Sequence, residues 1–252
     1  MNQQEALIDY LLRLADNGLI LGQRLGEWCG HGPVLEQDIA MTNIALDHIG
    51  QARNYYQYAA EIIADGRDED QLAFLRTVDQ YRNLLLLEQP NEDWAYTLVR
   101  SFLYDAFNYE CLYLLKSSTD QRIASIAEKA VKEVIYHRKF SSEWIIRMGD
   151  GTEESHLKIQ TALDDLWLYH AEFFEMLETD LLLLESGISL DLPSIKVNWL
   201  RHIENVISEA TLRVPSELAY QSGGTRGMHS EHLGYILTEL QYMQRTYPNM
   251  TW

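Results

Sequence analysis

The chain has 252 residues, of which 46% are hydrophobic and 11% aromatic, so it can bury a substantial core and is not intrinsically disordered. Its 20 Lys and Arg residues face 38 Asp and Glu residues, which gives a formal net charge of −18. Because nucleic acids and anionic membranes attract cationic proteins, this charge argues against both as partners and favours a basic protein partner.

Targeting and covalent features are scarce. Residues 1–10 lack the basic and apolar regions of a secretory signal. The leucine runs at 84–87 and 181–184 hold only four residues each, far short of the roughly 20 that a membrane span needs. The two cysteines, Cys29 and Cys111, lack the spacing of a zinc or redox motif. We therefore expect a reduced, cytoplasmic protein without a membrane segment.

Apolar residues recur at steps of three and four along nearly the whole chain, which is the spacing of amphipathic helices. The pattern predicts helices over the following ranges: 4–28, 34–64, 92–116, 120–148, 152–180, 197–213 and 229–246. Residues 66–92 are predicted to form a longer connection and residues 186–196 to be irregular. The sequence contains no β-hairpin or βαβ pattern.

Long helices that are joined by short turns pack as antiparallel bundles. We therefore predict an all-α fold, a long antiparallel four-helix bundle with additional C-terminal helices. A single domain is expected over residues 1–252, with the bundle core at about 4–180 and a C-terminal extension at about 186–252.

Polar residues on the buried side of the long helices are the candidate site residues. A bundle that holds two metal ions takes a Glu from each of two helices and a Glu-x-x-His pair from each of the other two, because positions i and i+3 share a face. The fourth predicted helix offers Val134 and His137 at this spacing, and the second offers His48 and Gln51. Neither pair has the glutamate.

Acidic residues lie near the same level of the other helices. Asp105 is the carboxylate of the third predicted helix, and Asp16 is the only acid near the middle of the first, in a register that the sequence does not fix. Together these residues look like a di-metal site that has lost most of its ligands. The candidates for this vestigial site are Asp47, His48, Gln51, Asp105, Val134 and His137. For Asp105 and His137 we favour a buried polar contact that fixes helix register over metal binding, because carboxylates are missing.

Three further motifs receive a structural interpretation. Glu153 and His156 match Glu-x-x-His, but they follow Thr152 at a predicted helix start, so we interpret them as a capped, solvated first turn. His170 is expected at the edge of the core. Gly223–Gly227 lacks the preceding strand and the Gly-Lys-Ser/Thr ending of a phosphate loop, so we expect a turn.

The connection at 66–92 holds a candidate binding site for an anion or a nucleotide tail. Loops collect binding residues, and arginine suits phosphate groups through its paired N–H donors. The candidate residues are Arg76, Thr77, Asp79 and Arg82. We favour solvated surface arginines over a binding site as the interpretation of this segment.

Three segments carry a resemblance to a known family: 25–33 (LGEWCGHGP), 36–53 (EQDIAMTNIALDHIGQAR) and 227–234 (GMHSEHLG). They resemble the C subunits of bacterial phenylacetyl-CoA monooxygenase (1,2-epoxidase), and the resemblance covers essentially the whole chain. It implies a ferritin-like fold and a structural subunit that supports a homologous A subunit. That A subunit is expected to carry the di-iron centre and to oxidise the ring of phenylacetyl-CoA.

The resemblance leads to a preferred function and an alternative. We expect a non-catalytic subunit in aerobic phenylacetate degradation that binds the A subunit and has no cofactor of its own. Self-association and a contact of the loop arginines with CoA are left open. The alternative is a metal-dependent oxidoreductase in its own right, with Asp105, His137 and either Asp47 or His48 around one metal ion. The sequence does not fix the stoichiometry or the helix face that meets the A subunit.

Overall fold

The computed structural model describes residues 1–216, 219–248 and 250, and in these residues it contains helices and no β-strand. The predicted all-α, ferritin-like fold is confirmed. The chain divides into two compact units: the first unit comprises Met1–Pro90 and Gly223–Trp252, and the second comprises Asn91–Ser222. This division does not test whether the chain folds as one domain over 1–252, which stays a prediction.

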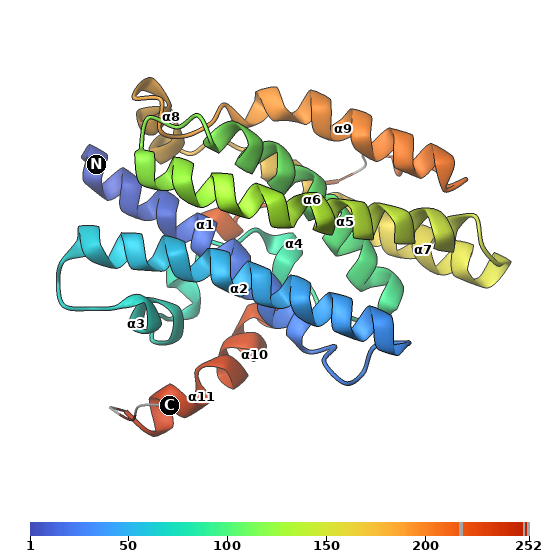
Figure 1. Cartoon of the computed structure of the whole chain (residues 1–252), viewed down its shortest axis with the longest axis horizontal. Coiled ribbons are helices and arrows are strands. Elements are labelled where there is room, and N and C mark those ends of the chain that lie inside the picture. Colours follow the sequence, from blue (N-terminus) through green and yellow to red (C-terminus); the bar gives the residue numbers. More distant parts are fainter. Residues whose placement is uncertain (217–218, 249, 251–252) are drawn as a thin grey trace. The chain divides into compact units, whose positions relative to one another are not determined.

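The first unit is built on an antiparallel pair of long helices, α1 (Gln3–Gly26) and α2 (Leu35–Ile63), which lie side by side (Figure 1). A capping box starts α1, because the Asn2 side chain accepts the Glu5 N–H at 2.8 Å and the Glu5 carboxylate accepts the Asn2 N–H at 2.9 Å. Gly18 lets the two backbones approach closely: a Cβ there would lie 2.8 Å from the backbone oxygen of His48.

Short elements complete the first unit. They are α3 (Glu69–Phe74), the 3-10 turns η1 (Val78–Gln80) and η3 (Gly224–Arg226), α4 (Leu85–Glu88), α10 (Glu231–Leu240) and α11 (Tyr242–Thr246). The prediction of one continuous helix over 229–246 is wrong. The helix is interrupted at Gln241, whose buried side chain donates to the Arg76 backbone oxygen at 2.9 Å. The turn predicted at Gly223–Gly227 is confirmed.

The second unit contains two long helices, α5 (Trp94–Leu115) and α6 (Gln121–Gly149), joined by a short turn. Asp120 ends this turn and starts α6, since one of its carboxylate oxygens accepts the N–H groups of Arg122 and Ile123, each at 3.0 Å. The elements that follow are α7 (Glu153–Leu166), the 3-10 helix η2 (Trp167–Phe174), α8 (Glu178–Glu185) and α9 (Leu192–Glu209).

The prediction of one helix over 152–180 is wrong in its second half, because α7 ends at Leu166 and a 3-10 helix follows. A 3-10 helix has three residues per turn, so Trp167 and His170 lie on the same side. Their rings are 4.4 Å apart, and His170 also stacks on Trp199 at 5.4 Å. Packing of these buried aromatic rings overrides the helical pattern. The expected position of His170 at the edge of the core is wrong, because the residue is buried inside the core.

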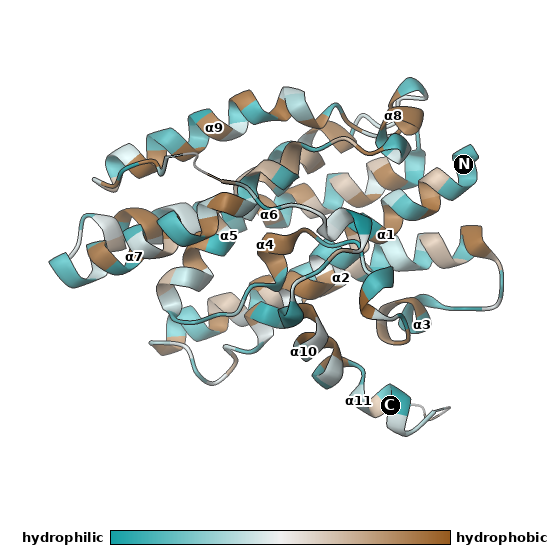
Figure 2. Cartoon of the chain, turned by 180° about the vertical axis from the view of Figure 1, so that it is seen from behind, coloured by the Kyte–Doolittle hydropathy of each residue, from teal (hydrophilic) through white to brown (hydrophobic). Residues whose placement is uncertain are grey.

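The irregular segment predicted at 186–196 is too long, because α9 already begins at Leu192. Pro193 occupies the first turn of α9, where its fixed φ suits the helix and its missing N–H has no partner to lose. Brown and teal segments alternate along α9 in Figure 2, which shows the amphipathic pattern of a helix that packs on one side.

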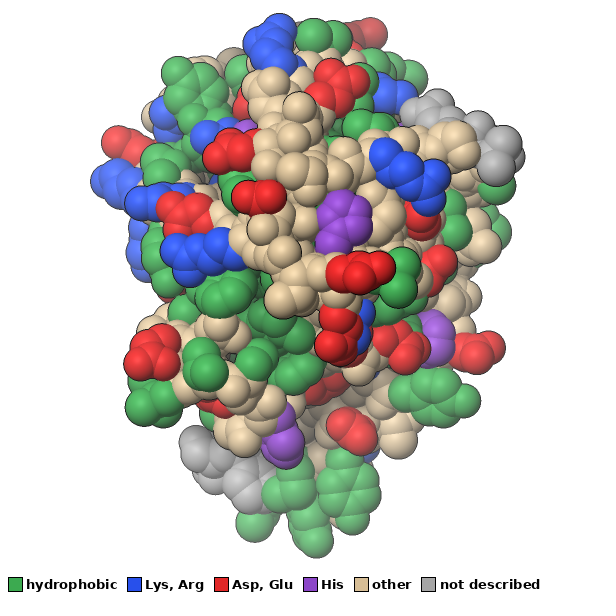
Figure 3. Space-filling view, turned by 90° about the vertical axis from the view of Figure 1, so that its right-hand side faces the viewer, with side chains coloured by type: hydrophobic (Ala, Val, Ile, Leu, Met, Phe, Trp, Pro, Cys, Tyr) green, Lys and Arg blue, Asp and Glu red, His purple; other side chains and the backbone are tan. Residues whose placement is uncertain are grey.

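None of the described helices combines the length and the hydrophobicity that crossing a bilayer requires. Large apolar side chains are nevertheless exposed at several places on the surface. Figure 3 shows such side chains, in green, at the surface among acidic ones in red.

Candidate functional site

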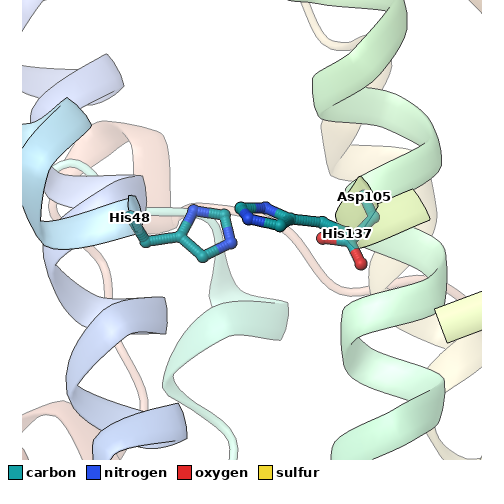
Figure 4. A group of neighbouring side chains, drawn as sticks. All are labelled: His48, Asp105 and His137. Carbon is teal, nitrogen blue, oxygen red and sulfur yellow. The ribbon is translucent and has the colours of Figure 1, made fainter. Parts of the chain in front are cut away.

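Asp105 on α5 and His137 on α6 form a buried polar pair in the second unit (Figure 4). The closest ligand atoms of the two side chains lie within 4.8 Å of one another. Burial raises the pKa of Asp105 to about 6, against the opposing effects of the His137 charge and a hydrogen bond from Ser141. Oδ1 of Asp105 has no hydrogen-bond partner among the described residues. The pair therefore offers one carboxylate and one imidazole to a ligand.

Val134 lies one helical turn before His137 on the same buried face of α6. It occupies the glutamate position of a Glu-x-x-His pair, and an aliphatic side chain cannot bind a metal ion. The structure thus places both residues where the sequence pattern predicted them, with an imidazole and no carboxylate at this helix.

On α2, His48 and Gln51 face the interior, while Asp47 is half-buried. Figure 4 shows the His48 side chain on α2. The prediction that at least one of these three residues points inward is confirmed for His48 and Gln51. The two residues are three positions apart and share a helix face, but they offer an imidazole and an amide in place of a carboxylate and an imidazole.

On α1, Asp16 is buried and already engaged within the first unit. Its carboxylate accepts hydrogen bonds from the Tyr56 hydroxyl, from the Arg76 guanidinium, with Nη1 3.0 Å from Oδ2, and from the Arg82 backbone N–H at 2.7 Å. Burial alone would lower the pKa of Arg76, but the Asp16 carboxylate raises it well above its usual value. The acid of the first helix therefore closes an ion pair and does not serve as a vacant ligand.

This ion pair corrects one expectation for the loop. Arg76 was expected to lie exposed as an anion contact, and that expectation is wrong because its side chain is buried against Asp16. Thr77 and Asp79 are exposed and bonded to each other, with Thr77 Oγ1 2.7 Å from Asp79 Oδ1. Arg82 is half-buried, with its Nε 3.6 Å from an Asp9 carboxylate oxygen. Of the four candidates, Arg82 is the one cation that solvent reaches.

Glu88 and His229 form a second buried ion pair in the first unit, which the sequence patterns did not identify. Nδ1 of His229 lies 2.7 Å from Glu88 Oε2, and its Nε2 lies 2.9 Å from the Tyr81 backbone oxygen. The other carboxylate oxygen of Glu88 accepts the Ser230 N–H at 2.6 Å. Two features of the sequence could have pointed to this pair. Glu88 directly follows a run of four leucines, and His229 lies in the segment 227–234 that carries the family resemblance.

The Glu-x-x-His match at Glu153 and His156 is a helix start, as predicted. The Thr152 hydroxyl accepts the Ser155 N–H at 3.2 Å, and the His156 ring lies 2.7 Å from the Gly149 backbone oxygen. The imidazole thus completes the turn between α6 and α7.

The donor chemistry does not fit a di-iron carboxylate centre. The glutamates of the two Glu-x-x-His positions are replaced by His48 on α2 and by Val134 on α6. Asp105 keeps a carboxylate on α5, and Asp16 on α1 is bonded to Arg76. Such a centre needs a carboxylate from each of four helices.

Comparisons with known proteins identify the family of the chain. The family model for the phenylacetic acid catabolic protein matches residues 1–252. The chain is 48% identical over 252 residues to the C subunit of the 1,2-phenylacetyl-CoA epoxidase of Escherichia coli (strain K12), and the match covers 100% of both chains. The resemblance seen in the segments 25–33, 36–53 and 227–234 is thereby confirmed. The chain therefore belongs to the phenylacetic acid catabolic protein family.

Proposed function

We propose that this chain is the structural, non-catalytic subunit of a multicomponent phenylacetyl-CoA 1,2-epoxidase, the ring-oxidising monooxygenase of aerobic phenylacetate degradation. In this role it binds a homologous A subunit that holds the di-iron centre, and it carries no cofactor itself. The full-length relative from Escherichia coli is named as a subunit of such an epoxidase, which supports the assignment to a hetero-oligomeric assembly.

The observation that carries the non-catalytic role is the replacement of the carboxylates. Oxygen activation at two irons needs glutamate or aspartate on each of the four site helices. Here Val134 fills one of these positions with an aliphatic side chain, and Asp16 is held in a buried ion pair with Arg76. A chain that has lost these ligands can still supply a large, rigid helical surface to a partner.

One observation favours a second candidate function, a metal-dependent oxidoreductase. Asp105 and His137 are buried with ligand atoms within 4.8 Å, and Oδ1 of Asp105 has no hydrogen-bond partner among the described residues. A catalytic metal ion usually takes three protein ligands. Asp47 or His48 is the third ligand that we expect from the sequence.

A reconstitution experiment tests the proposal and separates the two candidates. The purified chain is mixed with the purified A subunit, and complex formation and ring oxidation of phenylacetyl-CoA are both measured. We expect a stable complex and no oxidation by this chain alone. Asp105→Asn and His137→Gln variants that still form the complex should support wild-type oxidation. Loss of oxidation in complexes of normal stability would favour the metalloenzyme, and absence of any complex would contradict the structural role.

A further inference from the structure

Helix α2 carries a stripe of exposed apolar side chains that is turned away from most of its buried face, with Ile49 at its margin, where Cγ1 also lies close to Gly22 of α1. Its members are Leu35, Ile39, Leu46 and Ile49, which are 71%, 52%, 60% and 39% exposed. Thr42 and Arg53 continue the same line, so the six positions follow one another at steps of three and four residues. We call these six residues the α2 seam. Within the first unit, α2 lies in front of α1 in Figure 1.

Steps of four and three are the spacing with which one helix packs along another. The seam runs for about 27 Å, at 1.5 Å per residue from Leu35 to Arg53. The opposite face of α2, which includes His48 and Gln51, is buried. Isolated exposed leucines are common on protein surfaces, but an aligned series at this spacing is typical of a face that another helix covers.

Gly50 gives a second, separate reason to expect a partner helix at this surface. It lies in the interior of the 29-residue helix α2, one turn after Leu46 on the helix surface. Glycine destabilises a helix interior relative to alanine. A Cβ at Gly50 would meet nothing within 4 Å, so the packing of the chain does not require this glycine. A closely approaching helix from another protein would require it.

The charges beside the seam indicate the chemistry of that helix. Glu36 and Asp47 lie along one edge and Asp38 along the other, because each residue turns the helix by 100°. A hydrogen bond from the Gly32 backbone lowers the pKa of Asp38, which keeps it charged. The cation of the seam, Arg53, is already matched by Glu69, with Nη2 3.3 Å from Oε1. The edges are therefore acidic, and they fit a helix with Lys or Arg beside its apolar residues.

The same charges disfavour a second copy of this chain as the occupant. A copy would bring its own acidic edges and its own net charge of −18 to the contact. We propose that the α2 seam is the docking surface for a helix of the iron-bearing partner subunit, with apolar residues at the seam and basic residues along its edges. This inference rests on the proposed function, because it takes the partner from it.

The experiment measures the dissociation constant of the complex between the full chain and the purified A subunit. We expect Leu46→Glu and Ile49→Glu each to raise it by roughly 30-fold, because a charge replaces a desolvated apolar contact. Glu36→Lys should raise it by about fivefold, with a weaker dependence on salt. The matched control is Leu157→Glu on α7, which is 66% exposed and adds the same charge. It should bind as wild type.

Gly50→Ala keeps the test decisive even if a charged variant were to misfold. Alanine should raise the melting temperature of the isolated chain by about 2 °C, because its helix propensity is higher. At the same time it should weaken partner binding by about fivefold, because its methyl group holds the two backbones apart.

The outcomes separate this inference from the proposed function. If the wild-type chain binds the A subunit and all seam variants bind equally well, the assignment of the α2 seam as the docking surface is wrong and the structural role stands. If the wild-type chain does not bind at all, the proposed function fails and this inference fails with it. If the isolated chain forms a dimer that Leu46→Glu dissociates, the occupant is a second copy and the inference is overturned.

Discussion

His229 and Glu88, 141 positions apart in the sequence, form a buried ion pair with Nδ1 2.7 Å from Oε2. The second ring nitrogen of His229 faces the Tyr81 backbone oxygen at 2.9 Å. Both partners are acceptors, so this arrangement favours an imidazole that carries a proton on each ring nitrogen and is positively charged. This pair ties the segment before α10 to the end of α4 within the first unit.

The protonation of His229 predicts how stability depends on pH. Burial alone would lower the pKa of His229, but the hydrogen bond to Glu88 and its charge raise it above the usual value. A raised folded-state pKa gives a stabilisation that is full below the unfolded pKa of about 6.5 and is lost as the pH rises through the folded value. We expect the free energy of unfolding to fall as the pH rises from about 6.5 through the folded-state pKa of His229. The His229→Gln variant should show a smaller fall over the same pH range.

Chemical denaturation at a series of pH values measures this effect, with His31→Gln, a substitution of an exposed histidine, as the control. At pH 6, His229→Ala should lower the free energy of unfolding by about 3 kcal/mol, because it leaves the Glu88 charge buried without its partner. An equal pH dependence in wild type and His229→Gln would contradict the assignment.

Asp16 and Arg76 should behave as a coupled pair. Either Asp16→Asn or Arg76→Met leaves a buried charge without its partner and should lower the free energy of unfolding by about 3–5 kcal/mol. The double variant should lose less than the sum of the two single losses, because it removes both charges. A double-mutant cycle in urea measures the coupling. Asp65→Asn is the control, because its ion pair with Arg67 is exposed and its loss should change little. Strict additivity would argue against the pair.

Metal content separates the two proposed functions at Asp105. Under the structural role, we expect elemental analysis to find equally little iron or manganese in the wild-type chain and in Asp105→Asn. The variant should also be more stable at pH 7, by about 2–3 kcal/mol, because burial raises the pKa of Asp105 to about 6 and ionisation above that value destabilises the folded state. Asp150→Asn, at an exposed position, is the control. Stoichiometric metal that is lost in Asp105→Asn, together with lower stability, would support the metalloenzyme.

Arg82 is the residue with which to test a CoA contact, because Arg76 cannot be replaced without breaking its ion pair. A guanidinium that binds phosphate should contribute to affinity, so we expect Arg82→Gln to weaken CoA binding by about tenfold if the contact exists. Isothermal titration of CoA against the variant, the wild type and Arg67→Gln measures it. Equal affinities would dismiss the contact and leave Thr77 and Asp79 without a binding role.

Much of the fold was predictable from the sequence because its signals are local. The apolar period of α1, α2, α5 and α6 identified these helices within a few residues, and cap residues such as Asp120 marked their ends. The ligand positions of the candidate site also follow from the sequence spacing, which puts Val134 and His137 one helical turn apart. The replacement of carboxylates at these positions can be read from the sequence alone.

The tertiary structure decided the features that depend on distant partners. Arg76 is buried and forms an ion pair with Asp16. Residues 167–174 form a 3-10 helix, in which the His170 ring stacks on Trp199. The tertiary structure also decided which apolar residues of α2 face the core and which form the exposed seam, since both sets share the same helical period. The helical period determines the angle between the side chains of one helix. Only tertiary packing determines which of these side chains face the core and which charged residue of another segment lies beside each of them.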